Sequence, residues 1–409
     1  MREAILIRGA RQLLTLRGPS GPRRGIALRD VGLVQDGAVL IRDGMIVDVG
    51  PARRIENLAE ARSAVEIDAT GRVVMPGFVD CHTHLLSAPP PHADPADSVD
   101  RGPAALDACR RLVRTSPAST LKFRGREMLR QFARHGTTTV EAKSGYGQDE
   151  ASEIKMLRVL GALHHDPLDV AATYLGMLAV PPEYSGRTGD YLTEVCSVVL
   201  PRVAKHRLSQ FAGISWENET FTREQAVRYF TAARGLGLGL RVTGFPRAAV
   251  EFGAVTSDQT GPADAEDVAL LAHSSTISCL LPGSAFHGGT DRYPSARALI
   301  DEGAAVALAT DFNPHSSPTC NMQMMISLAC LRMKMTPAEA ISAATINGAH
   351  VIRRTDAVGS IEYGKQADLL ILQVSDYREI PHHFGQNLVR LTMKRGVILH
   401  DAEASCPRP

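Results

Sequence analysis

The middle of this chain alternates short β-type runs with helical stretches, a pattern typical of parallel β/α units. Helical stretches occupy, among others, residues 151–163, 222–233 and 336–344, and the last two begin with Thr or Ser capping chemistry. The β-type runs cover residues 77–80, 137–141, 170–175, 213–216, 238–242, 254–257, 276–281 and 306–309. These runs predict a closed (β/α)₈ barrel. A doubly wound open sheet is the alternative, but no Gly-x-Gly-x-x-Gly turn follows the first run.

Both ends of the chain carry a different pattern, with short β-type runs separated by Gly and Asp turns. The runs near the C-terminus resemble those near the N-terminus. We therefore expect one small β-sandwich domain built from residues 1–73 plus 362–409. The barrel domain is expected to occupy residues 74–361.

The overall composition is that of an ordinary globular protein, with 44% hydrophobic and 22% charged residues. A net charge of +1 provides no electrostatic footprint for nucleic acid or an anionic membrane. No apolar run approaches the roughly 20 residues of a membrane-spanning helix. The N-terminal stretch lacks the apolar core of a signal peptide, and seven Cys without a Cys-x-x-Cys pair argue against a disulfide framework. These features predict a cytoplasmic protein.

Two histidines and one aspartate follow strand-like runs in positions suited to metal binding. His82 and His84 are two residues apart at the end of a run, so they project to the same side if that run is a strand. Asp311 follows the apolar run 304–309, and catalytic residues of barrels come from the C-terminal ends of strands. Alone, the histidines could be polar turn residues and Asp311 a helix cap. Together the three predict a metal site.

Seven stretches resemble the amidohydrolase superfamily and, within it, the imidazolonepropionase family. The barrel ones are Pro-Gly-Phe-Val-Asp-Cys-His-Thr-His (76–84), His-Gly-Thr-Thr-Thr-Val-Glu-Ala-Lys-Ser-Gly-Tyr-Gly (135–147), Val-Pro-Pro-Glu-Tyr (180–184), Ala-Thr-Asp-Phe-Asn-Pro (309–314) and Lys-Met-Thr-Pro (334–337). The C-terminal ones are Gly-Lys-Gln-Ala-Asp-Leu (364–369) and Tyr-Arg-Glu-Ile-Pro-His-His-Phe-Gly (377–385). The likeness spans nearly the full chain.

This resemblance implies a hydrolase in which a metal-activated water opens a five-membered cyclic amide. It implies one divalent ion, Zn or Fe(II), held by His82, His84 and Asp311. Asp311 is also expected to act catalytically, by accepting the proton of the attacking water. Tyr146 and Asn313 map onto substrate-binding positions. The partners implied are a small-molecule substrate and a second copy of the chain in a homodimer, with no nucleic acid and no membrane.

Five positions depart from the family pattern. Thr243 stands where the family has a metal-binding His, and Pro246 where a proton-handling Glu follows three residues later. Gln259 and Leu178 each stand where the family has a His, and Pro91 stands where it has an Arg. Thr is a poor ligand beside His, and Pro has no acid–base chemistry. We therefore expect the usual reaction to be impaired or replaced, and the metal to bind more weakly.

Three other histidines offer a replacement site. His92, His287 and His315 follow the first, seventh and eighth predicted strands, on loops of the expected active-site face. They could be exposed loop residues. If the site has been rebuilt, at least one should point into the cavity that contains His82 and His84. Two hypotheses therefore stand: a metal-dependent hydrolase with an altered substrate, or a non-catalytic barrel that serves as a binding protein or partner.

Overall fold

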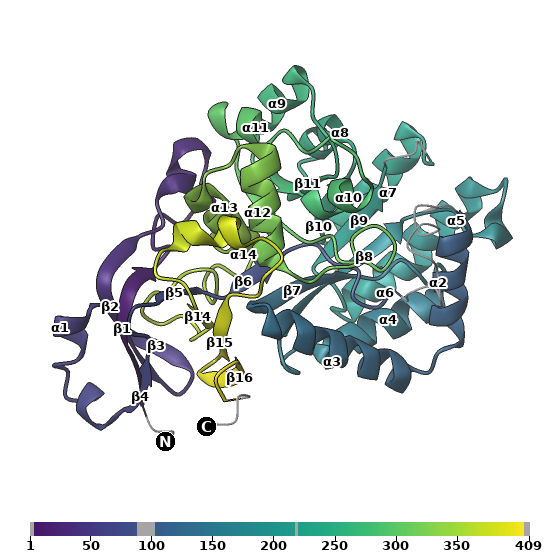
Figure 1. The fold of residues 1–409 in the computed structure, drawn as a ribbon. Helices are drawn as coiled ribbons and strands as arrows, with labels where there is room; N and C mark the ends of the chain where they lie inside the picture. The colour runs from purple at the N-terminus through teal and green to yellow at the C-terminus, as the bar shows by residue number, and fades with distance from the viewer. Residues whose placement is uncertain (1–3, 88–102, 217–219, 405–409) are drawn as a thin grey trace.

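The structure is a computed structural model that describes residues 4–87, 103–216 and 220–404. It consists of a barrel and a β-sheet unit built from both ends of the chain (Figure 1). Among the described residues, no helix is both long enough and apolar enough to cross a membrane.

The barrel contains eight parallel strands that neighbour one another in sequence order. They are β6 (Phe78–Asp80), β7 (Thr137–Lys143), β8 (Asp169–Met177), β9 (Phe211–Ser215), β10 (Gly239–Thr243), β11 (Thr256–Gln259), β12 (Ile277–Leu280) and β13 (Val306–Leu308). A parallel bridge between Thr83 and Phe312 joins the segments that follow the first and last strands. The predicted barrel is confirmed, and each of its eight predicted runs overlaps a strand.

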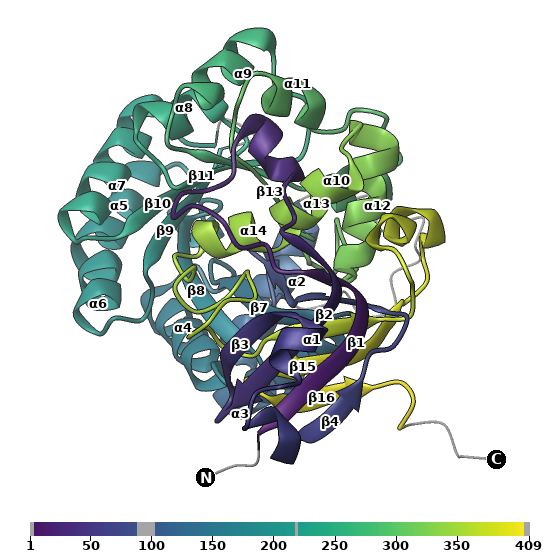
Figure 2. The same cartoon turned by 90° about the vertical axis from the view of Figure 1, so that its left-hand side faces the viewer.

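Helices surround these strands (Figure 2). The longer ones are α2 (Pro103–Thr115), α3 (Ala118–Arg134), α4 (Glu150–Leu163), α7 (Arg223–Gly235), α9 (Ala265–Ala272), α12 (Met322–Met333) and α13 (Pro337–Ala344). The shorter ones are α5 (Thr188–Glu194), α6 (Leu200–Lys205), α8 (Pro246–Glu251), α10 (Pro282–His287), α11 (Ala296–Asp301) and α14 (Ile346–Val351). The helix α1 (Ala52–Ile55) instead packs against strands β2 (Leu33–Arg42) and β3 (Met45–Pro51). Short 3₁₀ or π helices lie at Gly25–Arg29, Ala61–Ser63, Pro182–Tyr184, Val195–Val199 and Tyr377–His383. Capping boxes at Thr222 and Thr336 start α7 and α13, as the sequence predicts.

The second sheet combines strands from both ends of the chain, drawn purple and yellow side by side in Figure 1. Its strands are β1 (Ile5–Leu14), β2 (Leu33–Arg42), β3 (Met45–Pro51), β4 (Val65–Asp68), β5 (Val73–Pro76), β14 (Leu369–Leu372), β15 (Val389–Lys394) and β16 (Val397–Asp401). The antiparallel pair β5–β14 joins the N-terminal strands to the C-terminal ones. Neighbouring residues of β1 pack into different clusters, Leu6 on one face and Ile7 on the other. The expected composite β unit is confirmed, while the exact domain boundaries remain an interpretation.

A buried ion cluster attaches this sheet to the barrel. Lys394 of β15 is 4% exposed, and its Nζ lies 2.8 Å from Asp169 of β8 and 2.6 Å from Asp368. Arg395 also donates to Asp169, at 2.7 Å. Burial raises the pKa of Asp368, whereas the charge of Lys394 outweighs burial at Asp169 and lowers its pKa. Lys394 and Arg395 together therefore compensate the two carboxyl groups where the sheet meets the barrel.

Replacing Lys394 with Met should lower the free energy of unfolding by about 3 kcal/mol, because removing one partner of a buried ion pair leaves the other uncompensated. Urea denaturation at neutral pH measures this loss. The exposed Lys205 at the end of α6 provides a control, since Lys205→Met should change stability by less than about 0.5 kcal/mol. Equal stability of the two variants would show that the cluster contributes nothing.

Candidate metal centre

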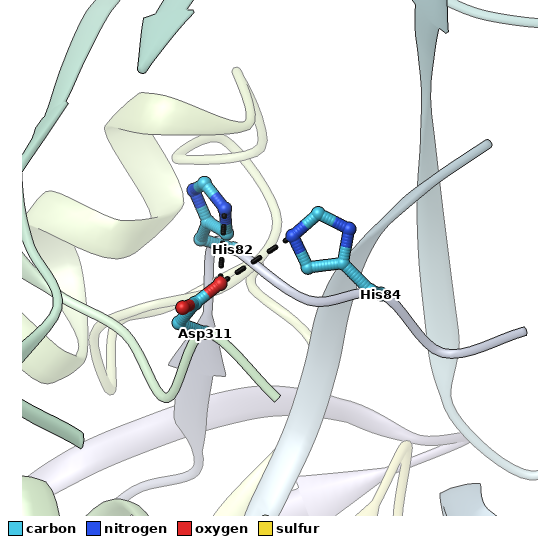
Figure 3. Close-up of side chains that lie close together, drawn as sticks. All are labelled: His82, His84 and Asp311. Atoms are coloured by element: carbon cyan, nitrogen blue, oxygen red, sulfur yellow. Dashed lines mark ion pairs between the residues drawn. The ribbon is translucent and has the colours of Figure 1, made fainter. Parts of the chain in front are cut away.

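The structure brings His82, His84 and Asp311 together at the C-terminal end of the barrel (Figure 3). The two histidines follow β6, and Asp311 follows β13. Nε2 of His82 and Nε2 of His84 each lie 3.4 Å from the same oxygen of Asp311, Oδ1. All three residues are buried. Two imidazole nitrogens and a carboxylate oxygen that converge in this way fit a divalent ion with an open coordination position.

Asp311 is held in an unusual backbone conformation. Its φ of 53° lies in the left-handed region, which costs energy for a residue other than glycine. Ser284 donates a hydrogen bond to its second carboxylate oxygen. Burial alone would raise the pKa of Asp311, but its hydrogen bonds with His84 and Ser284 lower it below its usual value. Asp311 is therefore an ionised, oriented carboxylate at neutral pH.

A second aspartate fixes the orientation of His82. Nδ1 of His82 lies 2.9 Å from Oδ2 of Asp258, which comes from β11. The charge of Arg241 and the hydrogen bond from His82 overcome burial and hold the pKa of Asp258 below its usual range. Burial and the nearby Lys143 lower the pKa of His82, so its imidazole is neutral. With Nδ1–H donated to Asp258, the Nε2 lone pair faces Asp311 and is free to bind a metal.

Below the histidines, the barrel interior contains a compact group of charges. Lys143 Nζ lies 2.7 Å from Glu141, and Arg241 lies between Glu141 at 3.7 Å and Asp258 at 3.4 Å. Arg241 also donates to the carbonyl oxygen of Cys81, at 2.8 Å. Two cations thus balance two carboxylates, as buried charges require. Lys143 belongs to this interior group and does not line the cavity described below.

Replacing Asp258 with Asn should weaken zinc binding roughly 10–100-fold, the usual cost of losing the outer partner of a metal-binding His. The amide of the introduced Asn has no negative charge, so it stabilises the Nδ1–H tautomer of His82 less than the carboxylate of Asp258 does. Competition against a coloured chelator measures the affinity. Ser257 lies on the same strand, and its buried Oγ has no partner among the described residues. Ser257→Ala should therefore leave the affinity unchanged, and an equal loss in both variants would argue against a specific role for Asp258.

A cavity of about 1420 Å³ opens above the three candidate ligands. His82, His84 and Asp311 line it, together with four of the five positions that depart from the family pattern: Leu178, Thr243, Pro246 and Gln259. Thr243 ends β10, Pro246 begins α8, and Gln259 ends β11. Pro91 lies outside the described residues. The departures are therefore gathered around the same cavity as the candidate metal ligands.

The two predicted substrate-binding residues, Tyr146 and Asn313, also line this cavity, but their side chains have different surroundings. The ring of Tyr146 packs edge-on against His84 with 5.6 Å between centroids, and burial raises the pKa of its hydroxyl well above the usual value. Asn313 instead uses its carboxamide within its own loop, in hydrogen bonds with the carbonyl of Asp311, the hydroxyl of Ser316 and the backbone N–H groups of His315 and Ser316. Asn313 shapes the loop, and its contact with substrate remains a prediction.

Of the three histidines considered for a replacement site, His315 lines the cavity. Its Nε2 lies 3.1 Å from Sγ of Cys109 on α2, and burial lowers its pKa. His287 ends α10, half-buried, and is not among the residues that line the cavity. His92 lies outside the described residues. Sequence reasoning missed Asp258 and Cys109, since no local pattern pairs them with His82 and His315.

Comparison with known proteins decides the family. The chain is 41% identical to the imidazolonepropionase of Solibacter usitatus, over 94% of this chain and 96% of that protein. It is 39% identical to that of Geobacillus kaustophilus, over 98% and 99%, and 36% identical to that of Alkaliphilus metalliredigens, over 97% and 98%. This chain belongs to the imidazolonepropionase family. The predicted resemblance is thereby confirmed.

Wider comparisons place this imidazolonepropionase-family chain among the amidohydrolases. The amidohydrolase family model matches residues 240–399. An adenosine deaminase from Xanthomonas campestris, solved with bound zinc, superposes with a TM-score of 0.68 at 18% identity, covering 96% of this chain and 92% of that one. An atrazine chlorohydrolase from Arthrobacter aurescens complexed with zinc gives 0.70 at 16% identity, over 98% and 96%. At such identities the likeness shows the shared fold.

Proposed function

We propose that this chain is a metal-dependent hydrolase that opens a C–N bond of a cyclic amide, with a substrate altered from imidazolone propionate. The observation that carries the proposal is the convergence of His82 and His84 on one oxygen of Asp311 inside a large cavity. Family membership supports the reaction class. The cavity is large enough for a small-molecule substrate, since such sites typically measure about 300–1,000 Å³.

One zinc or Fe(II) ion suits the donor set of His82, His84 and Asp311. Both metals accept imidazole and carboxylate ligands, and two solved structures of this fold contain zinc. When bound, such an ion polarises a carbonyl group and lowers the pKa of a water molecule. Because the chain supplies three ligands and no fourth from Thr243, we expect weaker binding than in a relative with an additional His.

The chain's own residues divide the remaining tasks. Asp311 is ionised, so its carboxylate can accept a proton. Asp258 keeps His82 in the required tautomer. Tyr146 packs against His84 and covers one side of it. His315 lines the same cavity with a neutral imidazole suited to proton transfer.

The departures from the family pattern favour a changed substrate. Thr243, Pro246 and Gln259 line the cavity where the family has groups that bind metal or move protons. The side chains of Thr, Pro and Gln have no group that titrates near neutral pH, so they cannot act as general acids or bases. The same three residues favour the alternative, a barrel that binds a small molecule without turning it over.

Metal analysis combined with turnover distinguishes the two functions. Protein purified without chelator should contain close to one zinc or iron per chain, and it should hydrolyse at least one member of a panel of five-membered lactams, imides and ureides. Dialysis against a chelator should abolish turnover, and adding zinc should restore it. Asp311→Asn provides the inactive control. Absence of metal and of turnover across the panel would contradict the hydrolase and favour the binding role.

A further inference from the structure

Gln259 places an unused carboxamide in the wall of the cavity. The residue ends β11 and is 4% exposed. Its backbone carbonyl accepts a hydrogen bond from Leu281 N–H at 2.9 Å, which fixes the backbone at this point. Neither Oε1 nor Nε2 of its side chain has a hydrogen-bond partner among the described residues. Buried polar groups are nearly always paired, so this carboxamide needs an explanation.

The other carboxamide in the wall shows the contrast. Both the amide group and the carbonyl oxygen of Asn313 form hydrogen bonds within its own loop, as described above. Unpaired buried hydroxyls such as those of Thr256 and Ser257 belong to strand residues that do not line the cavity. Gln259 is therefore a described cavity residue that still offers both a donor and an acceptor, close to the candidate metal ligands.

The chemistry of the group determines what it can recognise. A carboxamide presents an N–H donor and a C=O acceptor side by side in one plane. Its complement is a group with an adjacent acceptor and donor, such as the cis edge of an amide. Open-chain secondary amides are almost entirely trans, so their N–H and C=O point in opposite directions, whereas a small ring locks the amide cis. A carboxylate offers acceptors alone.

A neighbour of Gln259 across the strands is uncharged. Thr243 of β10 pairs with Asp258, the residue before Gln259, and lines the same cavity. The cavity also contains charged residues, Arg110 and Arg292 among them, but these come from other segments. A neutral amide edge loses little by leaving water if both of its hydrogen bonds are replaced.

We propose that Gln259 recognises the substrate by forming two hydrogen bonds with its cis-amide edge. Nε2 of Gln259 donates to the ring carbonyl, and Oε1 accepts from the adjacent ring N–H. This inference rests on the proposed function and makes it more specific. The substrate class is a lactam, cyclic imide or ureide with an unsubstituted N–H beside a carbonyl. Gln259 is thus a specificity-determining residue for this chain.

Hydantoin and 1,3-dimethylhydantoin test the proposal, because methylation blocks both ring N–H groups while leaving the carbonyls in place. Titrations followed by saturation-transfer NMR at pH 7 measure binding to the metal-depleted and the zinc-loaded protein. The wild type should bind hydantoin more tightly than the dimethyl compound. Gln259→Leu should weaken hydantoin binding roughly 10–100-fold, as expected when a hydrogen-bonding site loses its partner, and should change binding of the dimethyl compound less than twofold.

Two further measurements separate this role from a structural one. Gln259→Leu removes an unpaired buried group, so its melting temperature should rise by about 1–4 °C while its affinity for hydantoin falls. Gln259→Glu keeps the shape but loses the donor, so it should also weaken hydantoin binding. Equal affinity of the wild type for the two hydantoins, or of wild type and Gln259→Leu for hydantoin, would overturn the proposal.

The proposed function and this inference fail in different ways. If no metal-dependent turnover is found but Gln259→Leu still weakens hydantoin binding, the proposed hydrolase activity is wrong and the recognition role of Gln259 holds. If metal-dependent turnover is found but Gln259→Leu does not change hydantoin binding, the hydrolase activity holds and the recognition role is wrong.

Discussion

Replacing His84 with alanine should lower the affinity for zinc more than a hundredfold, beyond the roughly 10–100-fold cost of losing an outer partner. The reason is geometric: Nε2 of His84 is one of three donors that converge on the same point, and two remaining ligands cannot hold the ion. Zinc content after dialysis, measured by mass spectrometry, should fall from near one per chain to background.

His287→Ala is the matched control, because this half-buried histidine lies outside the cavity lining. Its zinc content should equal that of the wild type. If His84→Ala retained zinc as well as His287→Ala does, the metal would have to be held elsewhere and the assignment of the site would be wrong.

Turnover of imidazolone propionate should be roughly 10²–10⁴-fold slower than in relatives that retain the His and the Glu of the family pattern, since that is the usual contribution of a general acid–base group. Thr243 and Pro246 occupy these positions in the cavity wall and cannot transfer protons. Steady-state kinetics on the zinc-loaded protein provide the measurement. Ordinary turnover, about 1–10³ s⁻¹, would show that these positions are mapped wrongly.

The double variant Thr243→His with Pro246→Glu tests the same point by gain of function. Pro246 begins α8, where an acidic residue is favourable beside the helix dipole, so the variant should fold. Partial recovery of imidazolone propionate turnover is expected, with Thr243→Val and Pro246→Gln as the paired control that adds no acid–base group.

Most of the fold could be predicted from sequence because it depends on local patterns. Two barrel helices carry start signals that the sequence shows, the capping boxes at Thr222 and Thr336, whereas α5, α8 and α10 begin without a side-chain cap. The joining of the two chain ends was expected from the likeness of their strands. Strand ends were less certain: β8 extends to Met177, two residues beyond the predicted run, since tertiary pairing with β9 prolongs it.

The site was predictable only where spacing carries the information. His82 and His84 are two residues apart after a strand, and Asp311 follows another, so their convergence could be expected. Asp258 carries no spacing signal in the sequence, and its bond to His82 arises from the closure of the barrel. The internal bonding of Asn313 depends on the geometry of its loop, and the unpaired state of Gln259 depends on the packing around the end of β11. No local sequence pattern encodes either.

The sheet that joins both ends of the chain has a consequence for how the protein is made. Because β5 pairs with β14, the N-terminal part of the sheet is synthesised long before its C-terminal partner strands. Until then the free edge of β5 is exposed, and exposed strand edges invite pairing with other chains. The barrel lies between the two halves in sequence and can form while the sheet is incomplete. Completion of the sheet should therefore be the slow, concentration-sensitive event in biosynthesis, because its contacts span most of the chain.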